Sequence, residues 1–156
     1  MYQQKKLTQV SDPAFVTICD WYETWLGQAN HESRADIEAT MAHSLQSQGL
    51  PQTYLIYKGL DLVGMYQVAM ADDMTTRPNY YPWLINVYVD QPYRGQGAFT
   101  YIMAGLDGTM DQLGLPHLYC YSAICDLYEK FGWTKVETLP FPGKAHQMVH
   151  VYRKDR

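Results

Sequence analysis

The residues VYVDQPYRGQGAFTYIM, Val87–Met103, join a strand-like run to a helix-like run through a loop with one arginine and two near-adjacent glycines. Glycine adds nothing to packing, so its presence indicates a backbone that approaches another group closely or points several amides the same way. Amides at a helix N-terminus, the helix dipole and the permanent charge of Arg94 together favour a phosphate or pyrophosphate. A tight turn that merely requires glycine is the alternative, since the loop fits neither GxGxxG nor GxxxxGKS/T.

The elements around this loop predict a parallel βαβ unit. Trp83–Val89 is apolar enough for a central strand, and His117–Tyr121 predicts a second strand. The helix between them begins at about Gly97 and carries one apolar stripe, formed by Phe99, Ile102, Met103, Leu106, Met110 and Leu113. Such a crossover is nearly always right-handed and makes its two strands parallel.

The rest of the chain predicts two N-terminal helices and a set of hairpins. Asp12 before Pro13, and Ser33, are typical of helix starts, whereas Gly27 and the QGLP run at 48–51 are typical of helix ends. Strands are predicted at KKLTQV, TYLIYK, LVGMYQVAMAD, WTKVETL and HQMVHVY, and a short helix at Ile124, Leu127, Tyr128 and Phe131. The order predicts one α/β (α+β) domain over residues 1–156, with a mixed, mostly antiparallel central sheet, one parallel βαβ pair and flanking helices.

Composition narrows the classes of function. With 156 residues, 47% of them apolar, the chain is long enough for a sizeable core. The net charge of −4 and the lack of a basic run argue against binding to nucleic acid. No apolar run reaches transmembrane length, and MYQQKKLTQV lacks the apolar core of a signal peptide, so we expect a cytoplasmic protein without a membrane partner.

The cysteines and histidines predict neither a metal site nor a covalent intermediate. Cys19, Cys120 and Cys125 lack CxxC spacing and read as reduced thiols, and no histidine is visibly partnered with them. His146 and His150 are four apart in a predicted strand, which separates them too far to share a metal ion.

The glycine loop carries a resemblance to a known family. LINVYVDQPYRGQGAFTYIM resembles the acetyl-CoA signature Q/R-x-x-G-x-G/A of the GNAT superfamily of acyl-CoA-dependent N-acyltransferases, which follows a strand ending in valine. Arg94 and Gly97 fill the first two fixed positions, whereas Phe99 stands where glycine or alanine is usual.

A second signature follows in the expected order and spacing. YSAICDLYEKFGW, residues 121–133, resembles the family pattern N-x-x-A-x-x-L-Y-x-x-x-G-F. The matches are Leu127, Tyr128, Gly132 and, conservatively, Trp133; the departures are Tyr121 and Ile124 in place of asparagine and alanine. The order of elements along the whole chain also fits the family.

The resemblance implies a set of cofactor contacts. In such enzymes the strand equivalent to Trp83–Val89 is bulged and splays from its parallel neighbour, and pantetheine pairs with its amides. Those amides would belong to Val87, Tyr88 and Val89, and one of them can polarise the thioester carbonyl. The pyrophosphate would be bound next to Arg94 by the amides of Gly95, Gln96, Gly97, Ala98 and Phe99.

The resemblance also implies catalytic roles. Tyr128 falls on the tyrosine that protonates the departing thiolate, although it could instead be a core tyrosine. Relatives often carry, at the position near Asn86, a glutamate that acts as the general base. Asparagine cannot act as that base. Asp72 and Asp73 are the nearest carboxylates by topology, but a water chain is an equal alternative, and shaping the loop is the role we expect of them. The loop Thr75–Trp83 either contacts substrate or packs locally.

The resemblance implies an N-acetyltransferase that moves an acetyl group from acetyl-CoA, its cosubstrate, directly to a primary amine of a small molecule or peptide, without a metal. The alternative is a non-catalytic acyl-CoA-binding sensor or regulatory domain of the same fold, suggested by the altered second signature and the missing glutamate. The sequence is compatible with a homodimer and does not identify the acceptor.

Overall fold

The computed structural model describes residues 1–156. The elements in chain order are β1 (Tyr2–Leu7), α1 (Ala14–Tyr22), α2 (Arg34–His43), β2 (Gln52–Lys58), β3 (Asp61–Ala69), β4 (Trp83–Val89), α3 (Ala98–Leu113), β5 (His117–Ser122), β6 (Thr134–Phe141) and β7 (Lys144–Asp155). The strands form one mostly antiparallel sheet in the order β1-β2-β3-β4-β5-β7-β6, in which β4 and β5 are the parallel pair. The predicted fold class is confirmed.

The chain divides into two compact units, which we describe separately. Unit 1 comprises Met1–Gln67 and Asn86–Phe99, and unit 2 comprises Val68–Ile85 and Thr100–Arg156. The strands β3 and β4 and the helix α3 each contribute residues to both units.

Unit 1 packs two helices against antiparallel strands. β1 pairs with β2 from Tyr2↔Lys58 to Leu7↔Thr53. The apolar sides of α1 and α2 meet these strands in one buried cluster, whose members are Leu7, Ala14, Phe15, Ile18, Cys19, Trp21, Ile37, Met41, Leu45, Leu55 and Met65. Burial of these side chains is the main force that stabilises the unit.

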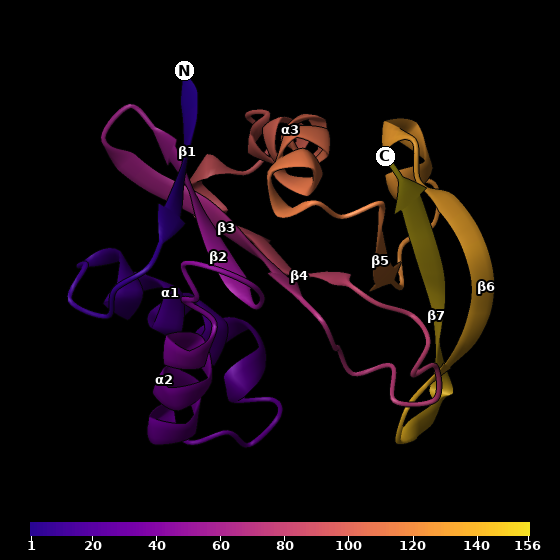
Figure 1. The fold of residues 1–156 in the computed structure, drawn as a ribbon. Helices are drawn as coiled ribbons and strands as arrows, with labels where there is room; N and C mark the ends of the chain where they lie inside the picture. Colours follow the sequence, from indigo (N-terminus) through magenta and orange to yellow (C-terminus); the bar gives the residue numbers. More distant parts are fainter. The chain divides into compact units, whose positions relative to one another are not determined.

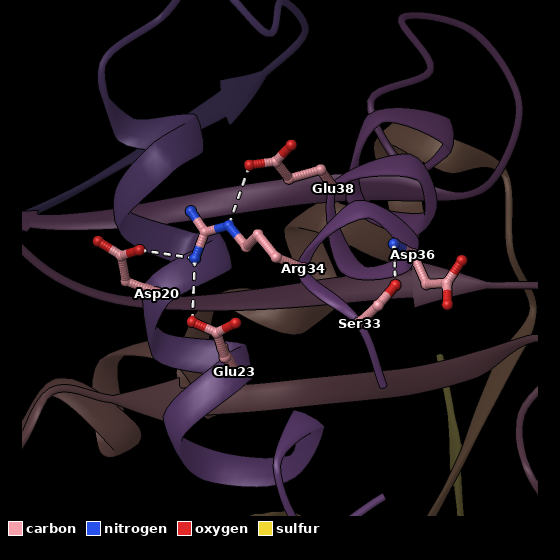
Figure 2. Close-up of polar contacts among 6 residues, drawn as sticks. All are labelled: Asp20, Glu23, Ser33, Arg34, Asp36 and Glu38. Atoms are coloured by element: carbon pink, nitrogen blue, oxygen red, sulfur yellow. Dashed lines mark hydrogen bonds and ion pairs between the residues drawn. The ribbon is translucent and has the colours of Figure 1, made fainter. Parts of the chain in front are cut away.

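The predicted helix starts in unit 1 are confirmed. Ser33 Oγ accepts a hydrogen bond from the amide of Asp36 at 3.1 Å and thereby caps α2 (Figure 2). At α1, Asp12 Oδ1 accepts a hydrogen bond from the amide of Ala14 at 3.0 Å. That hydrogen bond, followed by the one from Lys5, lowers the pKa of the Asp12 carboxyl.

Arg34 ties α2 to the preceding helix. Its guanidinium contacts Asp20 on α1 at 2.7 Å, Glu23 at 3.4 Å and Glu38 on α2 at 2.9 Å (Figure 2). The hydrogen bonds to Glu38 and Asp20 raise the pKa of the arginine further. Because these groups are partly exposed, each pair contributes at most about 1 kcal/mol, and the cluster mainly fixes the angle between the helices.

Unit 2 is built on the long β6–β7 hairpin (Figure 1). β7 also pairs with β5, from His117↔Asp155 to Ser122↔His150. The buried cluster on this unit contains Met74, Trp83, Tyr119, Leu139, Val149 and Val151. The end of β7 contacts α3 through ion pairs from Lys154 to Asp107 and from Arg156 to Asp111, at 3.4 and 3.0 Å.

Several predicted elements differ from the observed ones. The helix that begins at Ala14 ends at Gly27, as predicted, but its last turn, Glu23–Gly27, is a π-helix. β1 starts at Tyr2 and ends at Leu7, because its pairing with β2 covers only those residues. The predicted helix near Ile124 is wrong; a 3-10 turn, Tyr128–Phe131, is all that forms.

The failure of that helix has a local cause. Asp126 has a left-handed φ of 63°, which interrupts any helix that would begin before it. Ile124 is consequently 59% exposed instead of lying on an apolar helix face. Gly132 ends the turn with a φ of 85°, a conformation that explains the glycine there.

Gly64 sets how closely the backbones of β3 and β4 approach within unit 1. A Cβ atom at Gly64 would lie 2.7 Å from the carbonyl oxygen of Tyr88, closer than real contacts allow. Any side chain here must therefore push β4 away at the segment that contains the predicted cofactor residues.

We predict opposite effects for two glycine-to-alanine substitutions. Gly64→Ala should destabilise the protein by about 1–3 kcal/mol, because backbone must move to admit the methyl group. Gly105→Ala is the matched control: no atom lies within 4 Å of the position that its methyl group would take, so the variant should gain about 0.5–1 kcal/mol of helix stability. Urea unfolding of both variants measures this, and a Gly64→Ala variant as stable as the parent would contradict the close approach.

Candidate functional site

The glycine loop lies in unit 1, between β4 and the start of α3. Gly95 and Gly97 have φ values of 74° and 97°, which side chains other than glycine rarely adopt. The space beside them is open: nothing lies within 4 Å of a Cβ position at Gly95, and only the Tyr2 ring, at 3.9 Å, at Gly97. The loop thus has the conformation and the room to bring backbone amides against a ligand.

Gln96, between the two glycines, is held by three hydrogen bonds. Its carbonyl oxygen accepts one from the Tyr2 hydroxyl at 2.7 Å. Its side-chain oxygen accepts one from Lys58 Nζ at 2.8 Å, and its side-chain nitrogen donates one to the Pro92 carbonyl at 3.1 Å. These contacts fix the loop from β1 and β2, so the amides beside Gln96 are presented without a further ordering cost.

Arg94 is held against the end of β4. Its Nε donates to the carbonyl of Val89 at 2.8 Å, and its guanidinium lies 5.5 Å from the centre of the Tyr88 ring. That ring in turn lies 5.2 Å from both Trp21 and Trp25. The cation is therefore positioned beside the loop by an aromatic cluster.

Lys58 is a second cation at the loop, and sequence reasoning missed it. It ends β2, and its ammonium reaches Gln96 and also lies 6.0 Å from the centre of the Tyr2 ring. It is 38 residues from Gln96 in the chain, so no local motif links the two. Two cations and a run of amides make this part of unit 1 suited to an anion.

β4 is irregular just before the predicted pantetheine contacts. Asn86 has a left-handed φ of 51° within the strand, an irregularity of the kind that frees amides from a regular ladder. Its side-chain nitrogen donates to Gln67 Oε1 at 2.7 Å, and Gln67 Nε2 donates to Thr53 Oγ1 at 2.9 Å. Gln67 and Thr53 are fully buried, so this chain of hydrogen bonds holds the irregular backbone from inside the core.

The remaining predicted cofactor residues are distributed as follows. Val87, Tyr88 and Val89 are half-buried, as is Phe99, while Ala98 is buried and the loop residues Arg94–Gly97 are exposed. The structure brings all nine together in unit 1. Phe99, at the position where the family has a smaller residue, is in the first turn of α3.

Tyr128, the predicted acid, lies in unit 2 at the start of the 3-10 turn. Its side chain is buried, with ring centres of Trp133 and Tyr152 at 5.6 and 5.4 Å. Burial, with smaller contributions from Cys120 and Tyr152, raises the pKa of the Tyr128 phenol well above its ordinary value. The phenol therefore stays protonated at any physiological pH, so its hydroxyl can act as a hydrogen-bond donor.

Asp72 is a carboxyl of unit 2 whose pKa is strongly shifted. Burial raises the pKa of its carboxyl to about 7, against the opposing effect of the hydrogen bond from the amide of Asp73. The Cys120 thiol lies within electrostatic range of both Asp72 and Tyr128. A carboxyl that is half ionised near pH 7 is suited to exchange protons, which sequence alone could not indicate.

Asp73 has the structural role that we expected of both aspartates. Its carboxylate accepts a hydrogen bond from the Tyr121 hydroxyl at 3.2 Å, and its carbonyl accepts one from the amide of Thr75 at 2.8 Å. Tyr121 stands where the second signature has asparagine, so the departure from the family pattern supplies a contact to this loop.

The aromatic loop Thr75–Trp83 is packed against β6. Arg77 binds Glu137 through two hydrogen bonds, at 2.7 and 3.0 Å, and the Tyr80 hydroxyl donates to the same carboxylate. The hydrogen bonds from Arg77 and then Tyr80 lower the pKa of Glu137 to about 2. Beside this cluster an open pocket of about 520 Å³ is lined by Thr76, Arg77, Leu139, Pro140, Phe141, Pro142, Gly143 and Ala145.

One expectation about the cysteines is wrong. Cys125 Sγ lies 2.9 Å from His150 Nε2, so a partnered histidine does exist. The two residues are 25 apart in sequence, and only the pairing of β5 with β7 brings them together. No group of three or more His, Cys, Asp or Glu side chains is placed to hold a metal ion, and no helix is long and apolar enough to cross a membrane.

Comparison with known proteins identifies the family of the chain. The acetyltransferase (GNAT) family model matches residues 15–133. No curated protein matches the chain at a significant level.

Solved structures share the fold over nearly the whole chain. A chimera of the spermidine N-acetyltransferase SpeG from Vibrio cholerae and hSSAT is 16% identical, with 98% of this chain and 95% of that chain covered and a TM-score of 0.72. An acetyltransferase from Salmonella typhimurium that modifies the N-terminal serine of a 50S ribosomal subunit protein is 14% identical (99% and 95% covered, TM-score 0.72). An aminoglycoside 6'-N-acetyltransferase complexed with coenzyme A is 11% identical (98% and 96%, TM-score 0.74).

Proposed function

Because the chain belongs to the GNAT family of acetyltransferases, we propose that it transfers an acetyl group from acetyl-CoA directly to a primary amine of a small molecule or peptide. Residues 1–156 act in this proposal as a single catalytic domain. The observation that carries it is the glycine loop, where two left-handed glycines are bordered by open space and by the cations Arg94 and Lys58.

The loop is suited to the pyrophosphate of acetyl-CoA. The amides of Gly95–Phe99 supply neutral donors at the start of α3, and Arg94 and Lys58 supply charge. The irregular backbone at Asn86 supports pairing of Val87–Val89 with pantetheine. Among the similar structures, the aminoglycoside acetyltransferase was solved with coenzyme A, which supports the assignment by analogy.

The proposed chemistry forms one amide bond and breaks one thioester bond. The amine nitrogen attacks the acetyl carbonyl, whose developing negative charge is stabilised by a free amide of β4. As the carbon–sulfur bond breaks, Tyr128 donates its proton to the coenzyme A thiolate. The phenol of Tyr128 is protonated at neutral pH and is therefore in the form that can donate a proton.

We assign to Asp72 the role of the base that removes a proton from the attacking amine. An ordinary alkylammonium has a pKa of about 10.4 and must lose a proton before it can attack. Asp72, with a pKa of about 7, is ionised in a large fraction of molecules at neutral pH and is basic enough to accept that proton. Asp73 keeps its role in shaping the loop.

The similar proteins indicate that the acceptor is an amine. The three structures named above act on spermidine, an N-terminal serine and aminoglycosides, and all of these present an amine. In this chain the mostly apolar pocket of unit 2 offers room for the body of such an acceptor, with Pro140, Phe141 and Pro142 on its wall.

Gly97→Val should weaken acetyl-CoA binding by about tenfold to a hundredfold, because a side chain there strains the left-handed backbone and occupies the open space. Calorimetric titration with acetyl-CoA, with ATP and NAD as competing nucleotides, measures the change. Gly49→Val is the matched control, since Gly49 is also left-handed and open but lies outside the loop.

Equal affinity of Gly97→Val and the parent would reduce the loop to a turn. Binding of acetyl-CoA without turnover of any amine would favour the acyl-CoA sensor over the enzyme.

Tyr128→Phe should lower kcat by about a hundredfold or more while leaving acetyl-CoA affinity nearly unchanged, because only proton donation is removed. Coenzyme A release with spermidine, an aminoglycoside or a peptide with N-terminal serine as acceptor measures turnover. Tyr152→Phe, a neighbouring buried tyrosine, is the control and should retain activity. Full activity of Tyr128→Phe would return Tyr128 to a core role.

Asp72→Asn should abolish the acidic limb of the pH profile. Since the base acts only when deprotonated, kcat/KM of the parent should rise with pH through about 7, the pKa of Asp72. The variant should lose about a hundredfold in kcat/KM at pH 8 and show no inflection near 7. Asp73→Asn is the control and should keep the inflection near pH 7. If the inflection also persisted in Asp72→Asn, Asp72 would be excluded as the base.

A further inference from the structure

We propose that Cys125, His150 and Thr138 form a reactive thiol site that undergoes thiol–disulfide exchange with small disulfides. The site lies within unit 2, and the inference does not depend on acetyl transfer. The cluster has the three members that an activated nucleophile requires: a nucleophile, a base and a group that orients the base.

The distances define the arrangement. Cys125 Sγ lies 2.9 Å from His150 Nε2, and the other ring nitrogen of His150, Nδ1, lies 2.8 Å from Thr138 Oγ1. In the tautomer in which Nδ1–H donates a hydrogen bond to the Thr138 oxygen, Nε2 carries the lone pair and faces the thiol. The imidazole is thus oriented to take the proton of Cys125.

Three strands fix the histidine. His150 on β7 is directly opposite Ser122 on β5 and Thr138 on β6. Cys125 is in the loop that follows β5, where the left-handed backbone at Asp126 turns the chain. The base therefore sits on a rigid strand in the middle of a three-stranded ladder, whereas the nucleophile lies on an exposed loop that a reagent can reach.

The other two cysteines do not compete for such a reaction. Cys19 and Cys120 are fully buried. Burial raises the pKa of the Cys19 thiol to about 11 and also raises that of Cys120, so both are protonated and inaccessible in the folded protein. Cys125 is the exposed thiol of the chain, and it is the one with a histidine partner.

Other ionisable groups surround the pair. Tyr152 is two residues along β7 with its ring centre 6.5 Å from that of His150, and Glu129 acts on the same tyrosine from the 3-10 turn. Asp126 adjoins Cys125 in the loop, and Lys135 on β6 is opposite Tyr152. None of these is a cation in direct contact with the sulfur, so His150 is the group that can stabilise a thiolate.

In the proposed reaction the small disulfide is the oxidant of Cys125. The Cys125 proton moves to His150 Nε2, and the thiolate attacks one sulfur of the small disulfide. A Cys125–sulfur bond forms as the original sulfur–sulfur bond breaks, and the departing thiolate takes a proton from the imidazolium. The product is a mixed disulfide on Cys125, which an added thiol reverses by the same exchange.

The reaction of the native full chain with 5,5'-dithiobis(2-nitrobenzoate) tests the proposal. We expect one fast equivalent of released thiolate, lost in Cys125→Ser. His150→Gln should slow it by about tenfold at pH 7, because the ring nitrogen 2.9 Å from Cys125 Sγ that would take the thiol proton is removed. At pH 9.5 the parent and His150→Gln should react at similar rates. Glutathione disulfide should add one glutathione to the parent by intact mass.

Two further variants keep the test independent of folding. Thr138→Val should slow the fast equivalent and Thr138→Ser should restore it, since serine keeps the hydroxyl that orients the ring. An unfolded variant at His150 or Thr138 would expose Cys19 and Cys120 and release three equivalents, and an unfolded Cys125→Ser variant would release two. Unchanged rates at pH 7 in folded His150→Gln or Thr138→Val, or a fast equivalent that survives in Cys125→Ser, would overturn the proposal.

Discussion

The candidate cofactor segment depends on one constraint, the left-handed backbone at Asn86 in the middle of β4. The buried amide of Gln67 accepts a hydrogen bond from Asn86 and donates one to Thr53, whose hydroxyl donates to the carbonyl of Ser44 at 2.8 Å. Each group in this chain is satisfied by the next, and any break would leave a polar atom unpaired inside the core. These hydrogen bonds fix the backbone of β4 at Asn86, and Gly64 lets the backbones of β3 and β4 approach closely at Tyr88. Together they position the end of β4, from which the glycine loop begins.

The two units contribute different chemistry. Unit 1 contains the left-handed glycines and the cations Arg94 and Lys58, which together suit an anion. Unit 2 contains Asp72 and Tyr128, whose pKa values burial raises. Backbone amides do not titrate near neutral pH, whereas a carboxyl and a phenol can exchange protons.

Local pattern predicted most of the fold. β4 has the predicted bounds, and Ser33 caps α2 as expected, because a strand or a helix start is encoded in a few consecutive residues. The helix predicted near Ile124 failed because the left-handed turn at Asp126 has no strong marker in sequence. Apolar spacing at 124–131 satisfied a helical period over too few residues to be decisive.

The sequence by itself determined the order of the strands and of the α-helices α1–α3, the glycine loop between β4 and α3, and the position of Tyr128 in its motif. These depend on periodicity and on residues that are adjacent in the chain. Only the tertiary structure decided that Lys58 reaches Gln96 and that His150 faces Cys125. Strand pairing joins those residues across tens of positions, and burial sets the pKa of a carboxyl; neither leaves a mark on local sequence.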